Sequence, residues 1–193
     1  MDAVPRVVHP GPVADDHERA PGVPTVLGLS RSTILRLEDD ERVFAEGPGF
    51  RIVQWRNVLF THWSAPVSLE GLDASGEGSF DLATRYPKVM VFNVVAYGLQ
   101  IPRSDARRRA SEVLASTSGH VAAAVTVLPG EGFWASTARA AVATITLLSR
   151  VGHPHKVFGT VEDAATFVLP HVLPKDTPRA HLESALDRLT SGS

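Results

Sequence analysis

The chain contains no cysteine, and this absence excludes several kinds of chemistry at once. Disulfides, thiolate nucleophiles and cysteine-ligated zinc all require a thiol. Long apolar runs are missing too. The longest candidate, 140–148, is interrupted by Thr144 and Thr146 and is shorter than the roughly 18–20 apolar residues of a membrane span. The N-terminus also lacks the basic and apolar regions of a signal peptide. We therefore expect a cytoplasmic protein without a membrane span.

Neither sign of charge dominates the sequence. The formal net charge is -2 and the pI is about 6.4, so no basic field favours nucleic acid or an anionic membrane. Hydrophobic residues make up 44% of the 193 residues, which is typical of a soluble domain long enough to bury a core.

The composition divides the chain into three parts. Residues 1–24 hold five prolines and few large apolar side chains, which predicts a disordered tail. Residues 25–46 form a poorly defined lead-in. Residues 47–193 carry the regular apolar patterns and are predicted to be a single domain that ends in a helix.

Strand and helix patterns alternate through the predicted domain. The segments 50–55 and 58–63 flank Arg56 and Asn57 as an antiparallel hairpin. The runs 89–95 and 121–128 are apolar without alternation, which indicates strands covered on both faces. Because helical patterns separate them, the sequence predicts an α/β fold. We expect a small mixed, partly parallel sheet of four to six strands with helices packed on it.

Five helices are predicted from apolar periodicity and capping signals. They lie at 66–85, from an N-cap at Ser104, at 133–150, after a capping Thr160, and from 178 onward. The three glycines at 71, 76 and 78 are expected to weaken the first of these helices. The helix 133–150 is apolar nearly all round, so it is expected to be buried on more than one side.

No catalytic signature accompanies this pattern. The segment His153-Pro-His155 supplies only two of the three or four ligands that zinc needs, and it is interpreted as a solvated loop pair. There is no Gly-x-Ser-x-Gly elbow. The segment 129–132 lacks the remaining residues of a phosphate loop, so it is interpreted as a structural turn. We expect neither an enzyme nor a bound cofactor or metal.

Two groups of residues are candidates for an interaction surface. Arg103, Arg107 and Arg108 concentrate positive charge near one helix start, although a solvated helix face explains them as well. A second group, Phe133, Trp134 and Arg139, lies at a loop-to-helix junction and has the composition of interface anchors. The aromatic pair equally fits a plug at the end of the sheet.

The order of elements from Phe50 onward resembles the anti-sigma factor antagonist (SpoIIAA-like, or STAS) domains. The resemblance covers about 120 residues and includes the strand and capped helix within 156–165. It implies a sheet with helices mainly on one face and a role in binding proteins. The phosphorylatable Ser/Thr motif of that family is absent from 96–102, and the nearest serine is Ser104, a candidate phosphosite.

These observations lead to one functional expectation and two alternatives. The expected function is a non-catalytic protein-protein interaction or signalling domain, self-associating through its apolar helix or hairpin. The first alternative is a small-molecule or lipid-binding domain, because the small side chains of 135–143 could leave room beside the sheet. The second alternative is a hydrolase with dispersed acid-base residues.

Overall fold

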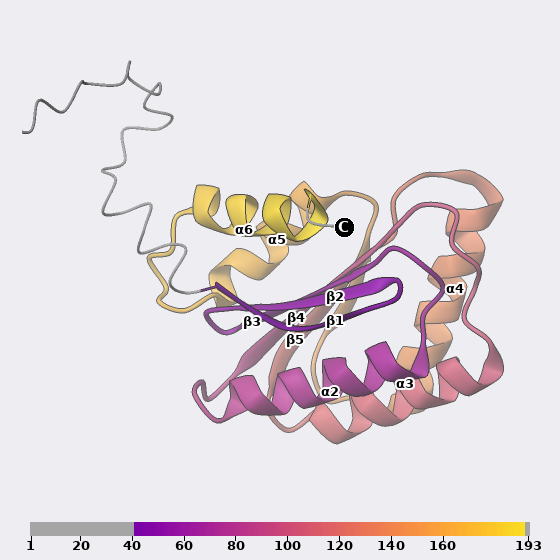
Figure 1. Ribbon diagram of the computed structural model, residues 1–193, viewed down its shortest axis with the longest axis horizontal. Coiled ribbons are helices and arrows are strands. Elements are labelled where there is room, and N and C mark those ends of the chain that lie inside the picture. The colour runs from indigo at the N-terminus through magenta and orange to yellow at the C-terminus, as the bar shows by residue number, and fades with distance from the viewer. Residues whose placement is uncertain (1–40, 192–193) are drawn as a thin grey trace, which may run out of the picture.

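The computed structural model describes residues 41–191, which form a six-stranded sheet covered by helices on both faces (Figure 1). The strands are β1 (Glu41–Gly47), β2 (Phe50–Trp55), β3 (Val58–Trp63), β4 (Val89–Val95), β5 (Val121–Val127) and β6 (His155–Phe158). The predicted tail and most of the predicted lead-in lie outside the described residues. The predicted domain start at residue 47 is too late, because β1 pairs with β2 along its length. The α/β class and the mixed sheet are confirmed.

The strands lie in the sheet in the order in which they occur in the sequence. Strands β1, β2 and β3 pair antiparallel, and β3, β4, β5 and β6 pair parallel. The predicted hairpin is confirmed, with Trp55 opposite Val58. Its turn places Arg56 at a φ of 52°.

The side chain of Asn57, the second residue of this turn, makes three hydrogen bonds to the backbone. Its Nδ2 donates to the carbonyls of Lys88 (3.2 Å) and His171 (3.0 Å), and its Oδ1 accepts from the backbone nitrogen of Leu173 (2.8 Å). One buried carboxamide therefore joins the hairpin, the start of β4 and the segment that precedes the last helix.

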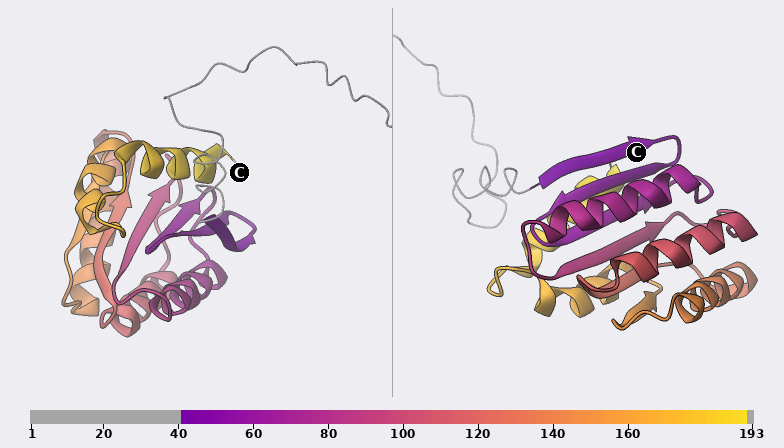
Figure 2. Two further views of the ribbon diagram at one scale, coloured as in Figure 1. Left: turned by 90° about the vertical axis from the view of Figure 1, so that its left-hand side faces the viewer. Right: turned by 90° about the horizontal axis from the view of Figure 1, so that it is seen from below.

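Three helices cover one face of the sheet: α2 (Leu69–Ala83), α3 (Ser104–Thr117) and α4 (Gly132–Ser149). Each connects two neighbouring parallel strands. Because such crossovers are right-handed and the strands advance in one direction, all three helices fall on the same face. They lie side by side in the right-hand view of Figure 2.

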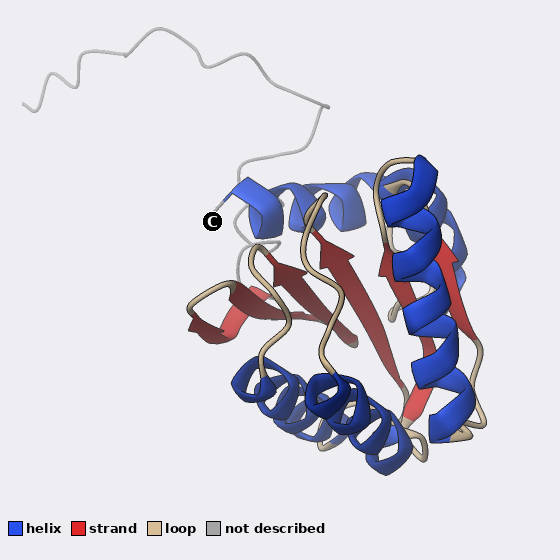
Figure 3. Cartoon of the chain, turned by 90° about the vertical axis from the view of Figure 1, so that its right-hand side faces the viewer, coloured by secondary structure: helices blue, strands red, loops and turns tan. Residues whose placement is uncertain are grey.

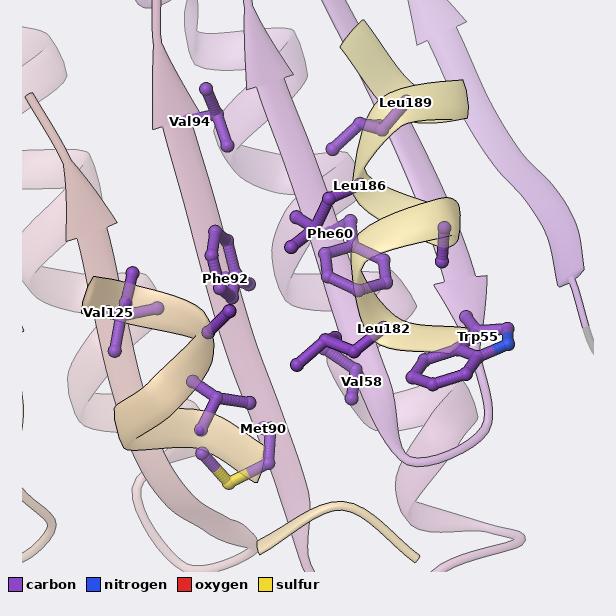
Figure 4. Close-up of a cluster of buried hydrophobic side chains, with 14 of the residues drawn as sticks. Trp55, Val58, Phe60, Met90, Phe92, Val94, Val125, Leu182, Leu186 and Leu189 are labelled. Carbon is purple, nitrogen blue, oxygen red and sulfur yellow. The ribbon is translucent and has the colours of Figure 1, made fainter. Parts of the chain in front are cut away.

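The opposite face is covered by α5 (Val161–Val168), the 3₁₀ turn η2 (Leu169–His171) and α6 (Arg179–Ser191). The buried leucines of α6, Leu182, Leu186 and Leu189, point from one side of that helix onto β2, β3 and β4 (Figure 4). Helices therefore cover both faces, whereas the family resemblance implied mainly one.

The glycines of α2 are packing positions. A Cβ at Gly71 would lie 2.6 Å from the Trp63 ring, and one at Gly78 would lie 2.9 Å from Leu59. The buried Gln54 of β2 donates from Nε2 to the carbonyl of Gly78 (3.0 Å) and to Asp81 Oδ2 (2.9 Å). Gly71 and Gly78, which were predicted to weaken the helix, thus let it approach the sheet closely, whereas Gly76 faces Val113 of α3.

Three further local predictions have different outcomes. The cap at Thr160 is confirmed, since its Oγ1 accepts from the backbone nitrogen of Asp163 at 3.2 Å. The N-cap of α3 is Arg103 and not Ser104, which is the first helical residue. Helix α4 is buried on one side only, because Phe133, Leu147 and Leu148 are exposed. Among the described residues, no helix has the length and apolar character needed to cross a bilayer.

Candidate functional site

A cavity of about 150 Å³ lies between the sheet and the three helices α2, α3 and α4. Its floor is formed by side chains of β4 and β5, including Val91 and Val95. Leu128, just after β5, and the loop 99–102 line the end nearest the carboxyl ends of the parallel strands. Ligands of open α/β sheets bind outside these strand ends. In Figure 3, loops lead from the arrowheads of the strands to the helices on this face.

The walls of the cavity are mostly apolar and consist in part of small side chains. Helix α3 contributes Ala106 and Ala110, and helix α4 contributes Ala138 and Ala141. Larger side chains at these positions would occupy the space between the helices. Among residues 41–191, no Asp, Glu, Lys or Arg lines the cavity, so this part of the chain offers no counter-ion to a charged molecule.

Polar side chains interrupt the apolar floor at two adjacent positions. Asn93 of β4 and Thr126 of β5 are partners in the parallel pairing, and both line the cavity. Asn93 Nδ2 makes one long hydrogen bond, 3.5 Å to the carbonyl of Val125. Within the described part of the chain, Oδ1 of Asn93 forms no hydrogen bond. The floor therefore retains unused hydrogen-bonding capacity in an apolar surrounding.

His155 of β6 connects this floor to α4 through a directed chain of hydrogen bonds. Thr146 Oγ1 donates to the carbonyl of Val142 (2.9 Å), so it accepts from Nδ1 of His155 (2.9 Å). With the proton on Nδ1 of a neutral ring, Nε2 is an acceptor and takes the hydroxyl hydrogen of Thr126 (3.0 Å). The lone pairs of Thr126 Oγ1 thus remain available as acceptors.

Burial keeps His155 in its neutral form. Desolvation, with a smaller contribution from the nearby His153, lowers the pKa of His155 from 6.5 to about 4. His153 itself is 8% exposed, and burial lowers its pKa too. The interpretation of these two residues as a solvated loop pair is therefore wrong, because His153 is buried and His155 is a half-buried residue of β6 with both ring nitrogens hydrogen-bonded.

Trp134 closes the cavity at the start of α4. Its Nε1 donates to the carbonyl of Leu99 at 2.7 Å, and its ring centroid lies 5.0 Å from that of Tyr97. Tyr97 in turn covers Gly130, where a Cβ would lie 2.5 Å from its ring and where φ is +89°. These contacts hold the loop after β4 against the loop before α4.

The aromatic pair 133–134 does not form one patch. Trp134 is half-buried and lines the cavity, whereas Phe133 is 88% exposed. Arg139 Nη2 donates to the carbonyl of Gly130 (3.2 Å), so it supports the same loop as Trp134.

The arginines of α3 lie on its outer side. Arg103 and Arg108 are exposed, Arg107 is half-buried, and the candidate phosphosite Ser104 is exposed. Arg108 pairs with Glu112 at 3.7 Å. The neighbouring Arg109 pairs with Glu112 (3.0 Å) and with Asp73 of α2 (2.5 Å). None of the predicted interaction residues except Trp134 lines the cavity.

Within residues 41–191, no three His, Asp or Glu side chains gather in an arrangement that could hold a metal ion. Comparison with models of protein families, with curated proteins and with solved structures finds no match. The resemblance to the STAS domains stays a prediction.

Sequence reasoning did not single out Asn93 and Thr126, and it interpreted His155 as part of a solvated loop. Asn93 and Thr126 were visible as the only strongly polar residues within the apolar runs 89–95 and 121–127. Their positions relative to the strand pairing make them neighbours, and that register is not readable from either run alone.

Replacing Trp134 by alanine should destabilise the protein, and replacing Phe133 should not. Trp134→Ala removes the hydrogen bond to Leu99 and the packing against Tyr97, at a cost of about 2 kcal/mol or more. Phe133→Ala removes an exposed ring and should change stability by less than about 0.5 kcal/mol. Urea unfolding of the two variants measures the difference. Equal effects would contradict the assignment of Trp134 as the closing residue.

The low pKa of His155 should make stability depend on pH. In the unfolded chain this histidine binds a proton near pH 6.5, but in the folded protein it does so only near pH 4. The free energy of unfolding should therefore fall as the pH drops from about 6.5 to 4, by roughly 3 kcal/mol from this group.

Proton NMR of the imidazole measures the folded pKa directly. The variant His155→Gln should show a smaller decrease in stability over the same pH range. A His155 resonance that titrates near pH 6.5 in the folded protein would contradict the assigned neutral ring.

Proposed function

We propose that this chain is a binding domain for a small, largely apolar molecule, held between the sheet and helices α2–α4. The observation that carries the proposal is the cavity itself, with apolar walls and a polar spot on its floor. Binding sites for small molecules have this composition, in which a few polar groups orient the ligand and apolar surface provides most of the affinity. Among the three functions expected from the sequence, this is the first alternative.

Two features of the sequence support a cavity that is built into the fold. Alanines occupy facing positions on α3 and α4, where larger residues would fill the space. Asn93 and Thr126 occupy strand positions that a purely structural core would fill with apolar side chains. Neither the small alanine side chains nor the two polar side chains improve the packing of the isolated domain.

Filling the cavity should abolish binding without unfolding the protein. Ala138 is 7% exposed and lines the cavity, so Ala138→Leu should occupy part of the space. Binding of a small apolar probe, ethylbenzene, should weaken at least about tenfold, which is about 1.4 kcal/mol. The melting temperature should stay equal or rise, because the new side chain fills a void.

Ala140→Leu is the matched control, since Ala140 lies on the exposed side of the same helix. It should bind ethylbenzene as the unsubstituted protein does. NMR titration of the full chain measures both affinities. The proposal fails if the unsubstituted protein does not bind the probe, or if the two variants weaken binding equally.

A second function, protein-protein interaction through α4, is supported by a different observation. Phe133, Leu147 and Leu148 are 88%, 78% and 64% exposed along this helix. Large apolar side chains that are exposed are found at contact surfaces. If this surface mediates self-association, Leu147→Ser should shift the mass in solution toward the monomer. Sedimentation measures that mass, and a monomeric unsubstituted protein at high micromolar concentration would contradict self-association.

A further inference from the structure

The cavity floor defines the chemistry of the polar group that it can bind. Three properties of the cavity restrict this group. They are the charge of the wall, the direction of the hydrogen bonds through His155, and the atoms of Asn93 that make no hydrogen bond to another described residue. The inference rests on the proposed function and identifies the class of ligand.

The first restriction is on charge. In the described part of the chain, no Asp, Glu, Lys or Arg side chain lines the cavity, and the one titratable side chain in its wall is the neutral ring of His155. An ion that entered would lose its hydration without gaining a counter-ion, which costs several kcal/mol or more. An uncharged ligand avoids this cost.

The second restriction is on hydrogen-bond direction. Thr146 donates to Val142, His155 donates to Thr146, and Thr126 donates to His155. The hydroxyl hydrogen of Thr126 is thereby used inside the protein, and only its lone pairs face a ligand. Oδ1 of Asn93, on the neighbouring strand, is a second acceptor, and no other described residue donates to it. A ligand that donates a hydrogen bond can use either of these two adjacent acceptors.

The other polar side chains of the wall do not change this requirement. Ser79 Oγ contacts His120 Nε2 at 3.1 Å, and Thr117 donates to the carbonyl of Val113 at 2.9 Å. Gln100 is exposed on the loop, and Ser75 is half-buried on α2. Only Asn93 and Thr126 lie side by side on the sheet.

We propose that the cavity binds an uncharged molecule of about the size of a single ring that carries a hydroxyl or N–H group, which donates to Asn93 Oδ1, beside the acceptor Thr126 Oγ1. The size follows from the volume of about 150 Å³, because an engineered cavity of about this volume in another protein holds benzene. The apolar part of the ligand packs against the alanines of α3 and α4.

A set of probes of matched size tests this class on the full chain. Ethylbenzene has no polar group, anisole has only an acceptor, benzyl alcohol has a donor, and benzylammonium and benzoate carry charge. The alcohol loses more hydration than the ether on binding. The informative quantity is therefore the ratio of the anisole to the benzyl alcohol dissociation constant, compared between proteins.

The variant Asn93→Leu removes the acceptor and nearly preserves the volume. We expect this ratio to fall about fivefold to tenfold in the variant, while its affinity for ethylbenzene changes little. The control Ser75→Ala should leave the ratio unchanged. Retained ethylbenzene binding shows that each variant is folded with its cavity intact. Both charged probes should bind more weakly to the unsubstituted protein than benzyl alcohol by tenfold or more.

The outcomes separate this inference from the proposed function. Binding of ethylbenzene with an unchanged ratio in Asn93→Leu would overturn the donor requirement and leave the binding cavity standing. A fall of the ratio in Ser75→Ala instead would place the polar group against α2 and would also overturn it. Benzoate or benzylammonium that binds as tightly as the alcohol would overturn the uncharged class. No binding of ethylbenzene to the unsubstituted protein would refute the proposed function, and this inference with it.

Discussion

Everything on the cavity side of this protein depends on the consecutive parallel pairing of β3, β4, β5 and β6. Right-handed crossovers between strands that advance in one direction place every connecting helix on the same face. Three helices must then share the width of four strands. The cavity lies where they meet over β4 and β5, because the facing side chains of α3 and α4 are too small to close that space.

The opposite face has no crossover helices, so the chain covers it with the segments that follow β6. Asn57 is central to this arrangement, since its carboxamide bonds to the backbone at Lys88, His171 and Leu173. With the chain fixed there, the leucines of α6 reach the sheet and bury Trp55 and Phe60 (Figure 4). One face is thus densely packed and the other retains space, which is the asymmetry expected of a scaffold with a binding side.

The chemistry of the cavity arises from a balance between burial and hydrogen bonding. Burial disfavours the charged form of His155, and the chain from Thr126 to Val142 uses the hydrogens of the neutral form. The same chain fixes which atoms remain for a ligand. Trp134 contributes from the opposite end, where its hydrogen bond to Leu99 holds the loop that covers the cavity. The polar residues of the floor and Trp134 come from different strands and helices, and all of them line the same cavity.

Local patterns in the sequence determined the class of fold, the hairpin at 50–63, the parallel strands 89–95 and 121–127, and the capped helix at Thr160, because apolar periodicity and capping act over a few residues. They could not determine β1, whose strand character depends on pairing with β2, or the role of the α2 glycines, which depends on the ring of Trp63. The tertiary structure alone decided that Trp134 faces inward while Phe133 faces solvent, and that His155 is held between Thr126 and Thr146. It also placed Asn93 beside Thr126, since the register between two strands is set by the crossover that joins them and by the helices packed above, and neither is encoded within a strand.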